Sequence, residues 1–255
     1  MVERAKTDKE WLRRVKKSLS SLYYGGAPTP LSVKKEAALL LGPHISLQQV
    51  YAQTEIMEIT LLDGPEHHAE PNPEQSLRMD STGKVTRPGC VRIVDGDNKT
   101  CEVGQYGYIE VFANPRFCVT GYFGAPEKTA QLFSDDGFIR TGDMGYLDKD
   151  NYLFICGRDK DMIVTEMGYN VFASDVETVL AKLPQVRDVA VTGVRPNGDE
   201  GFEYVCAFVV LSESISASDL FEYCKANLAS AKVPSFIRFV DDLPRNRNSA
   251  HQSEN

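Results

Sequence analysis

The sequence has little positive charge for its length and no long hydrophobic run. Its 28 lysines and arginines are outnumbered by 36 aspartates and glutamates, which gives a formal net charge of -8. Binding along a nucleic-acid backbone depends on clustered basic side chains that displace counterions. We therefore expect no nucleic-acid partner, no membrane span and, in the absence of an apolar signal segment, a cytoplasmic location.

Cysteine and histidine are scarce in the patterns that bind metals. The six cysteines are far apart and form no C-x-x-C pair, and the adjacent His67 and His68 have a poor geometry for ligating one ion. A zinc site and a disulfide framework are therefore not expected. The cysteines are interpreted as reduced residues of the core.

An apolar content of 42% is enough for one large domain or two smaller ones. Residues 20–24 and 46–51 have strand patterns, and between them lie a glycine-rich loop at 25–28 and a helical pattern at 34–41. This order predicts an α/β layer. Residues 63–81 are rich in Pro, Glu, His and Asn without periodicity, and are interpreted as a surface loop or linker.

The middle of the chain has short strand patterns separated by turns. They lie at residues 90–94, 108–112 and 152–155. Short strands at this spacing predict either a small β-barrel or an antiparallel layer.

The last part of the chain has the pattern of a separate α+β unit. Ser174 and Glu177 have the spacing of a capping box, which predicts a helix there, and Ser218 is the expected cap of a second helix. Strands are expected at 189–194, 204–211 and 236–240.

Several polar residues have both a structural and a chemical interpretation. Asp143 follows a glycine and is either a turn residue or a carboxylate for a ribose diol, and Arg158 is either a surface ion-pair partner or a donor for a nucleotide. Thr54 and Glu55 offer a hydroxyl and a carboxylate side by side, which suits phosphate oxygens and a cation such as Mg2+. None of these signals is specific alone.

The order of the motifs is more specific, because six of them occur in the register of the adenylate-forming superfamily. They are Gly25-Gly26-Ala27-Pro28, Tyr51-Ala52-Gln53-Thr54-Glu55, Gly121-Tyr122 ahead of Pro126-Glu127, Asp136 to Asp143, Gly157 to Ile163, and Gly168-Tyr169-Asn170-Val171. Acyl-CoA synthetases belong to this superfamily. The chain resembles the C-terminal half of such an enzyme.

The resemblance implies a fold that combines α/β and α+β parts. Residues 1–82 would be the C-terminal remnant of the large AMP-binding domain, and 83–158 a small β-barrel-like subdomain. Residues 159–160 would form a hinge, and 161–250 the mobile C-terminal α+β domain.

The resemblance also implies the reaction of an AMP-forming acid–thiol ligase. A carboxylate attacks the α-phosphate of ATP to give an acyl-adenylate, and a thiol then displaces AMP. ATP or AMP, Mg2+, and coenzyme A or phosphopantetheine are the implied cofactors. The implied partners are a carboxylic acid, a thiol acceptor and, in one interpretation, a missing N-terminal half or partner chain.

The residue roles follow from the same resemblance. Thr54 would contact phosphate and Glu55 would bind magnesium, while Asp143 and Arg158 would hold the ribose and Lys160 would be the hinge. The remaining cofactor-binding residues would be Gly26, Ala27, Pro28, Tyr51, Ala52 and Gln53 for the nucleotide, and Gly168, Tyr169 and Asn170 along the thiol tunnel.

Two departures from the family pattern concern catalysis. The family's glycine-rich phosphate loop is not found, and Ala250 stands where the family has a lysine that reaches the carboxylate and the α-phosphate. Losing one such charge slows a reaction by about a hundredfold to a thousandfold. Three interpretations stay open: a piece of an acid–thiol ligase, a non-catalytic descendant that binds a nucleotide, acyl carrier or partner, and a split enzyme.

Overall fold

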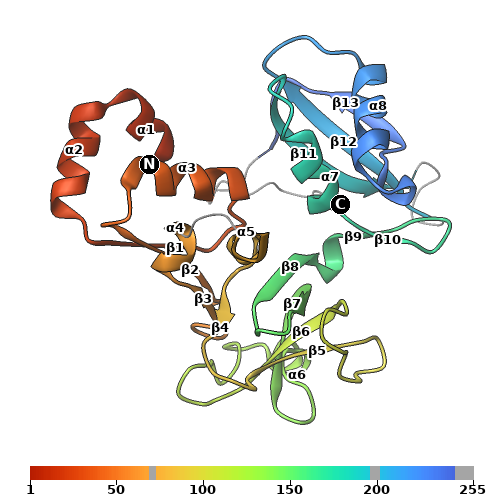
Figure 1. The fold of residues 1–255 in the computed structure, drawn as a ribbon. Helices are drawn as coiled ribbons and strands as arrows, with labels where there is room; N and C mark the ends of the chain where they lie inside the picture. Colours follow the sequence, from red (N-terminus) through yellow and green to blue (C-terminus); the bar gives the residue numbers. More distant parts are fainter. Residues whose placement is uncertain (69–72, 196–201, 245–255) are drawn as a thin grey trace. The chain divides into compact units, whose positions relative to one another are not determined.

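The computed structural model describes residues 1–68, 73–195 and 202–244. By its internal contacts the chain divides into two units, Met1–Ile155 and Cys156–Asn255. Figure 1 labels the elements of each. Lys160 and the rest of the expected hinge lie in the second unit, and the hinge and the three expected domain ranges stay predictions.

The first unit begins with an α/β layer. Strands β1 (Ser21–Gly25) and β2 (Ser46–Tyr51) pair in parallel, and helix α3 (Leu31–Leu41) connects them. β3 (Thr60–Leu62) and β4 (Lys84–Val85) extend the sheet in antiparallel pairing. Ala38 and Leu41 of the helix pack with Ile45 and Leu47 in one apolar cluster, which explains why the helix covers this sheet. The predicted α/β layer is confirmed.

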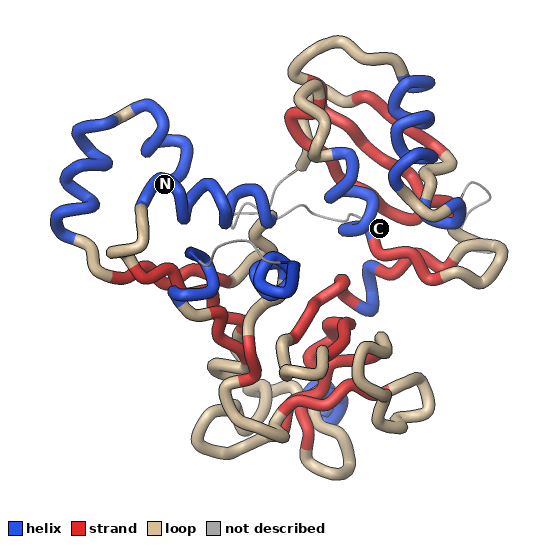
Figure 2. Tube along the Cα trace, in the orientation of Figure 1, coloured by secondary structure: helices blue, strands red, loops and turns tan. Residues whose placement is uncertain are grey.

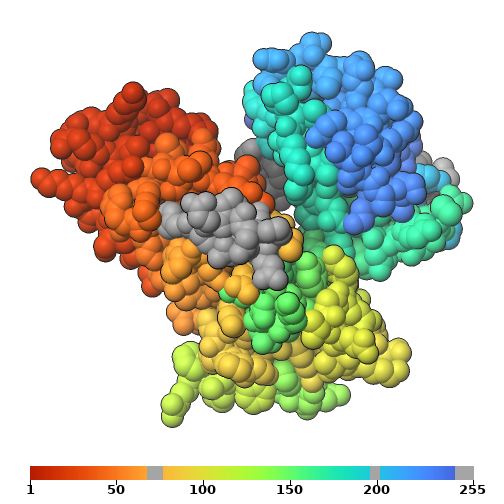
Figure 3. Space-filling model, viewed as in Figure 1, coloured from red at the N-terminus to blue at the C-terminus, as the bar shows by residue number. Residues whose placement is uncertain are grey.

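Further helices of this unit lie before this layer in the sequence or within its connections. They are α1 (Val2–Thr7), α2 (Lys9–Ser18), α4 (Gly64–His68) and α5 (Pro73–Asp80). Asp8 caps α2 by accepting a hydrogen bond from the backbone N–H of Trp11 at 2.8 Å. In the space-filling view α1 and α2, in red, form one continuous surface (Figure 3).

The interpretation of residues 63–81 as a surface loop or linker was wrong, because helices α4 and α5 lie within this range. Tertiary contacts hold both helices. His67 of α4 is 2% exposed and bonds to the hydroxyl of Tyr24 at 2.7 Å. Lys34 of α3 donates to the carbonyls of Met79 at 2.8 Å and Ser81 at 3.0 Å, where α5 ends. These contacts come from distant parts of the chain and leave no local periodicity.

A four-stranded sheet follows in the order β5-β6-β7-β8. Its strands are β5 (Val91–Val94), β6 (Gly107–Phe112), β7 (Phe138–Leu147) and β8 (Leu153–Arg158), and helix α6 (Pro126–Leu132) precedes β7. β6 pairs antiparallel with both β5 and β7. Within the described residues β5 and β8 stand at opposite ends of this order and do not pair with each other, so the antiparallel layer is present and a closed barrel is not. The mixed fold class is confirmed.

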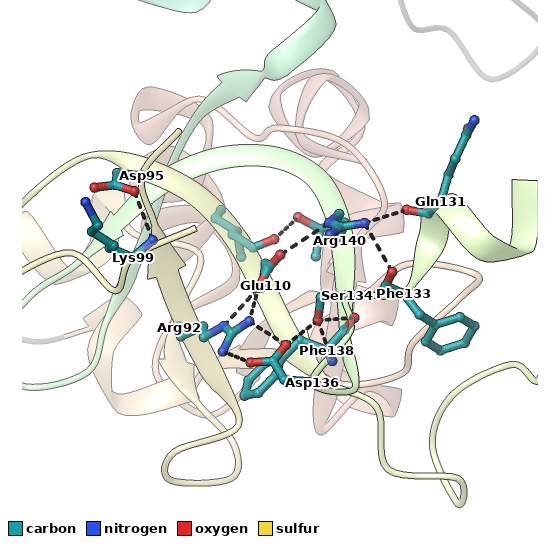
Figure 4. Close-up of polar contacts among 12 residues, drawn as sticks. Arg92, Asp95, Lys99, Glu110, Gln131, Phe133, Ser134, Asp136, Phe138 and Arg140 are labelled. Carbon is teal, nitrogen blue, oxygen red and sulfur yellow. Dashed lines mark hydrogen bonds and ion pairs between the residues drawn. The ribbon is translucent and has the colours of Figure 1, made fainter. Parts of the chain in front are cut away.

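A buried carboxylate ties three strands of this sheet together (Figure 4). Glu110 of β6 is 2% exposed and accepts from Arg92 of β5 at 2.6 and 2.9 Å. Arg92 also donates to Asp136 at 2.5 Å, and its guanidinium lies 3.8 Å from the ring centroid of Phe138. Arg140 of β7 lies 3.6 Å from the other oxygen of Glu110. The negative charge of Glu110 is thus compensated from both neighbouring strands.

The described residues of the second unit form two sheets and two α-helices. Its strands are β9 (Met162–Val164), β10 (Asn170–Phe172), β11 (Val186–Val194), β12 (Tyr204–Leu211) and β13 (Phe236–Phe239), and its helices are α7 (Ala173–Leu180), α8 (Ala217–Asn227) and the short η1 (Asp159–Asp161) and η2 (Ser230–Lys232). β12 pairs antiparallel with β11 and parallel with β13.

Both α-helices of this unit pack on one face of its three-stranded sheet (Figure 2). Val176 and Leu180 of α7 and Leu220 and Cys224 of α8 share an apolar cluster with alternate residues of β11 and β12. Alternate residues of a strand point to the same face, so this cluster is a single layer between helices and sheet. The predicted α+β unit is confirmed.

The predicted helix caps of this unit were wrong. Ser174 lies inside α7, where its hydroxyl donates to the carbonyl of Cys156 at 2.5 Å, and Glu177 accepts from the N–H of Val191 at 2.8 Å. In α8 the cap is Ser216, which accepts from the N–H of Asp219, while Ser218 is a helical residue.

Candidate functional site

A tight turn directly after β2 presents Thr54 and Glu55. The N–H of Gln53 donates to the carbonyl of Ile56 at 2.9 Å, and the N–H of Ile56 donates to the carbonyl of Gln53 at 3.2 Å. Ile56 is fully buried in the core of the second sheet, Thr54 is exposed and Glu55 is half-buried. The buried end of the turn therefore anchors two polar side chains at its tip.

Asp143 of β7 lies beside this turn. The hydroxyl of Tyr51 donates to Asp143 Oδ2 at 2.5 Å, and the amide Nε2 of Gln53 donates to the same oxygen at 2.8 Å. Gln53 Nε2 also donates to the carbonyl of Thr141 at 2.9 Å. Asp143 is 6% exposed. Two side chains about ninety positions earlier in the sequence thus hold its carboxyl group in one orientation.

Glu55 has a partner that the sequence motifs did not assign. The hydroxyl of Tyr122 donates to Glu55 Oε1 at 2.5 Å, and the N–H of Val119 donates to the carbonyl of Glu55 at 2.9 Å. The hydrogen bond to the carboxylate raises the pKa of the Tyr122 phenol. Gly121-Tyr122 was one of the six motifs, but no spacing along the chain shows which side chain the phenol meets.

The glycine loop borders an open hollow of about 330 Å3, lined by Tyr23, Tyr24, Gly25, Gly26, Val50 and Ala52. A Cβ on Gly25 would lie 2.2 Å from the carbonyl oxygen of Val50, and Gly26 has a φ of +82°. The loop therefore needs glycine at both positions. Gly26 and Ala52 both line this hollow, whereas Ala27 and Pro28 are exposed and are not among its lining residues.

The other expected site residues belong to the second unit. Arg158 ends β8 and Lys160 lies in η1, and both are exposed. The turn between β9 and β10 contains Gly168 and Tyr169, and Asn170 is the first residue of β10. In this turn the N–H of Gly168 donates to the carbonyl of Thr165 at 2.8 Å. Ala250 lies outside the described residues.

The residues of the turn suit a cation that is shared with a phosphate group. Mg2+ in nucleotide sites is commonly held by one or two carboxylates, water and the phosphates themselves. Glu55 supplies one such carboxylate, positioned by Tyr122. Over residues 1–68, 73–195 and 202–244 no group of three His, Cys, Asp or Glu side chains could hold a metal alone.

The first unit therefore presents the fixed carboxylate of Asp143 beside the turn that carries Thr54 and Glu55, and a hollow lined by two glycines. The second unit is a small α+β domain. Residues 175–250 match the family model described as the AMP-binding enzyme C-terminal domain. The chain matches the C-terminal half of an adenylate-forming enzyme.

Two curated relatives illustrate this similarity. The 2-succinylbenzoate–CoA ligase of Bacillus pumilus is 31% identical over 235 residues, which is 92% of this chain and 45% of that protein. The fatty acid–[acyl-carrier-protein] ligase ScoC of Streptomyces coeruleorubidus is 35% identical over 231 residues, which is 90% of this chain and 42% of that protein. The chain spans about half the length of these relatives.

Solved structures also match this chain over about half of their own length. A mutant of the amide bond synthetase Mcba from Marinactinospora thermotolerans has a TM-score of 0.78 and 32% identity, covering 95% of this chain and 47% of that one. The o-succinylbenzoate CoA synthetase MenE of Bacillus subtilis, in complex with ATP and magnesium ion, has a TM-score of 0.74 and 28% identity, covering 95% and 49%. Among the described residues, no helix is both long and apolar enough to cross a membrane.

Proposed function

We propose that this chain is the C-terminal portion of an AMP-forming acid–thiol ligase, and that its first unit holds the nucleotide. The observation that carries the proposal is the convergence of Tyr51 and Gln53 on Asp143 Oδ2, beside the turn that presents Thr54 and Glu55. A carboxylate fixed by two donors is preorganised to accept hydrogen bonds from the two hydroxyls of a ribose. The nucleotide complexes of MenE support this proposal.

Each residue has a proposed task in the first half-reaction. Asp143 and Arg158 hold the ribose of the nucleotide. The Thr54 hydroxyl donates to a phosphate oxygen. Glu55 holds the magnesium ion, which when bound neutralises charge on the phosphates. The hollow at Gly26 and Ala52 lets the nucleotide approach the backbone closely, because no Cβ projects from the two glycines of the loop.

The second unit has proposed tasks in the thiol step. Lys160 is the pivot, and the turn at Gly168, Tyr169 and Asn170 lines the path of the thiol, whether that of coenzyme A or of phosphopantetheine. Such a rearrangement assembles one site for each half-reaction. The partners are then a carboxylic acid and a thiol acceptor, and a cytoplasmic location remains our expectation.

A second candidate function is a non-catalytic module that binds a nucleotide, an acyl carrier or a partner protein. The observation that favours it is Ala250, in the position where the family has its adenylation lysine. The first candidate requires nucleotide binding, whereas the second includes forms that bind only an acyl carrier or a partner protein. Adenylation is measured by acid-dependent exchange of labelled pyrophosphate into ATP. We expect no exchange by this chain alone.

Nucleotide binding itself is tested by titrating the purified chain with AMP in a calorimeter. Asp143→Asn keeps the size of the side chain but removes its charge, and we expect it to weaken AMP binding about tenfold, as loss of one charge-assisted hydrogen bond does. Asp97→Asn is the matched control, because Asp97 lies in an exposed turn. Unchanged affinity of Asp143→Asn would contradict the ribose assignment.

A further inference from the structure

The Glu55 segment is tied to a second segment of the chain over several residues. Their backbones are joined by hydrogen bonds from Val119 N–H to the Glu55 carbonyl and from Met57 N–H to the Phe117 carbonyl, both at 2.9 Å. Between them Ile56 and Cys118 form an antiparallel bridge. The stretch that follows, which contains Tyr122, therefore has a defined position relative to Glu55.

Tyr122 is held from its other side as well. Its N–H donates to Thr129 Oγ1 at 2.9 Å, and that hydroxyl donates to the carbonyl of Ala125 at 3.0 Å. The residue before it, Gly121, has a φ of +150°, and a Cβ there would lie 2.6 Å from Thr129 Cγ2. The glycine therefore allows the loop to lie against Thr129, which fixes where the phenol points.

Burial does not account for this arrangement. Tyr122 is 41% exposed, so its ring contributes less to the core than the fully buried Ile56 does. What the loop does achieve is a phenol hydroxyl that donates to one oxygen of one carboxylate, Glu55 Oε1, at 2.5 Å. Such a charge-assisted hydrogen bond fixes the plane of the carboxylate.

We propose that Tyr122 is a positioning residue for the divalent cation. By occupying Oε1, its hydroxyl orients Glu55 so that Oε2 is the oxygen presented to the metal. The proposal rests on the proposed function, since it takes Glu55 as the cation ligand. Groups that orient a metal ligand from outside the coordination sphere typically change metal affinity by about 10-fold to 100-fold when removed.

The test uses Mn2+ alone as the probe and the full chain as the sample. Carboxyl carbons of glutamate are labelled with 13C, the Glu55 signal is assigned by its loss in Glu55→Gln, and paramagnetic broadening of that signal is followed against Mn2+ concentration. In Tyr122→Phe we expect the midpoint to rise about tenfold. Tyr106→Phe is the control, because it removes the hydroxyl of another exposed tyrosine of the same unit.

Each other outcome overturns the proposal. An unchanged midpoint in Tyr122→Phe shows that the phenol does not position the ligand, and a lower midpoint shows that it competes with the metal. Selective broadening of other glutamates while Glu55 stays sharp shows that Glu55 is not a cation ligand. Because no nucleotide is present, these results are independent of AMP binding, so failure of the proposed function is recognised separately by calorimetry.

Discussion

Arg92 and Glu110 form a two-donor ion pair across β5 and β6, with Nε and Nη2 of the arginine at 2.9 and 2.6 Å from one carboxylate oxygen. Glu110 is the more deeply buried partner, at 2% exposed against 21% for the arginine side chain. Removing one partner of such a pair leaves a charge in an apolar layer, which is far more costly than the pair itself. The two residues therefore act as one structural unit in this sheet.

Arg92→Met is accordingly expected to lower the free energy of unfolding of the first unit by about 3 kcal/mol. Urea unfolding followed by fluorescence reports on this unit, because Trp11 is the single tryptophan of the chain. Lys99→Met is the control within the same unit, since the ion pair of Lys99 with Asp97 has side chains 75% and 77% exposed and is expected to contribute less than about 1 kcal/mol. Equal effects of the two substitutions would show that Glu110 finds adequate compensation in Arg140.

The hydrogen bond from Tyr51 to Asp143 predicts non-additive effects on AMP binding. Tyr51→Phe removes a donor to Asp143 Oδ2 that acts beside Gln53, and we expect about a fivefold loss of affinity, corresponding to about 1 kcal/mol. In a background of Asp143→Asn the same substitution is expected to have little further effect, because the charge that the phenol orients is already gone. Calorimetric titration of both single variants and the double variant measures this coupling. Additive losses would mean that Tyr51 contacts the nucleotide independently of Asp143.

The sequence predicted the α/β layer and the α+β unit because their apolar residues recur with helical or strand period. It did not predict α4 and α5, because these helices depend on distant partners. The hydroxyl of Tyr152 donates to Glu66 of α4, and Arg78 of α5 pairs with Asp150 at 3.0 Å. Both contacts join positions more than seventy residues apart, which no local pattern encodes.

The candidate site shows the same limit. Motif order assigned ribose and metal roles to Asp143 and Glu55, and the structure brings Tyr51 and Gln53 to the first of these carboxylates. The donor to the second, Tyr122, is 67 positions away from Glu55. A motif identifies which residues recur together, whereas the hydrogen bond depends on how two loops pack.

Lys34 gives a prediction for the pH dependence of stability. Lys34 is 3% exposed, and burial lowers the pKa of its ammonium group from the usual 10.5 to about 8. Between these two values the unfolded chain binds more protons than the folded chain, so stability rises with pH. Between about pH 8 and 10.5, the free energy of unfolding is expected to rise, relative to that of Lys34→Met, by up to about 1.4 kcal/mol per pH unit. Urea unfolding at pH 7.5, 8.5 and 9.5, read by Trp11, compares the two proteins. Parallel pH profiles would show that the carbonyls of Met79 and Ser81 keep the ammonium charged.

Ser216 and Ser218 allow the cap of α8 to be tested with a matched pair of substitutions. Ser216 Oγ accepts from the N–H of Asp219 at 3.1 Å and donates to the carboxylate of that residue at 2.7 Å, so it satisfies one of the unpaired donors at the helix start. Ser216→Ala is therefore expected to destabilise the second unit by about 1 kcal/mol.

Ser218→Ala removes the same hydroxyl two positions later, inside the helix, where alanine has the higher helix propensity. We expect it to be neutral or slightly stabilising. Amide hydrogen exchange of α8 residues measures both effects within this unit, without requiring the two units to unfold together. If Ser218→Ala accelerated exchange of the first helical turn more than Ser216→Ala, the cap would be Ser218, as the sequence pattern alone had indicated.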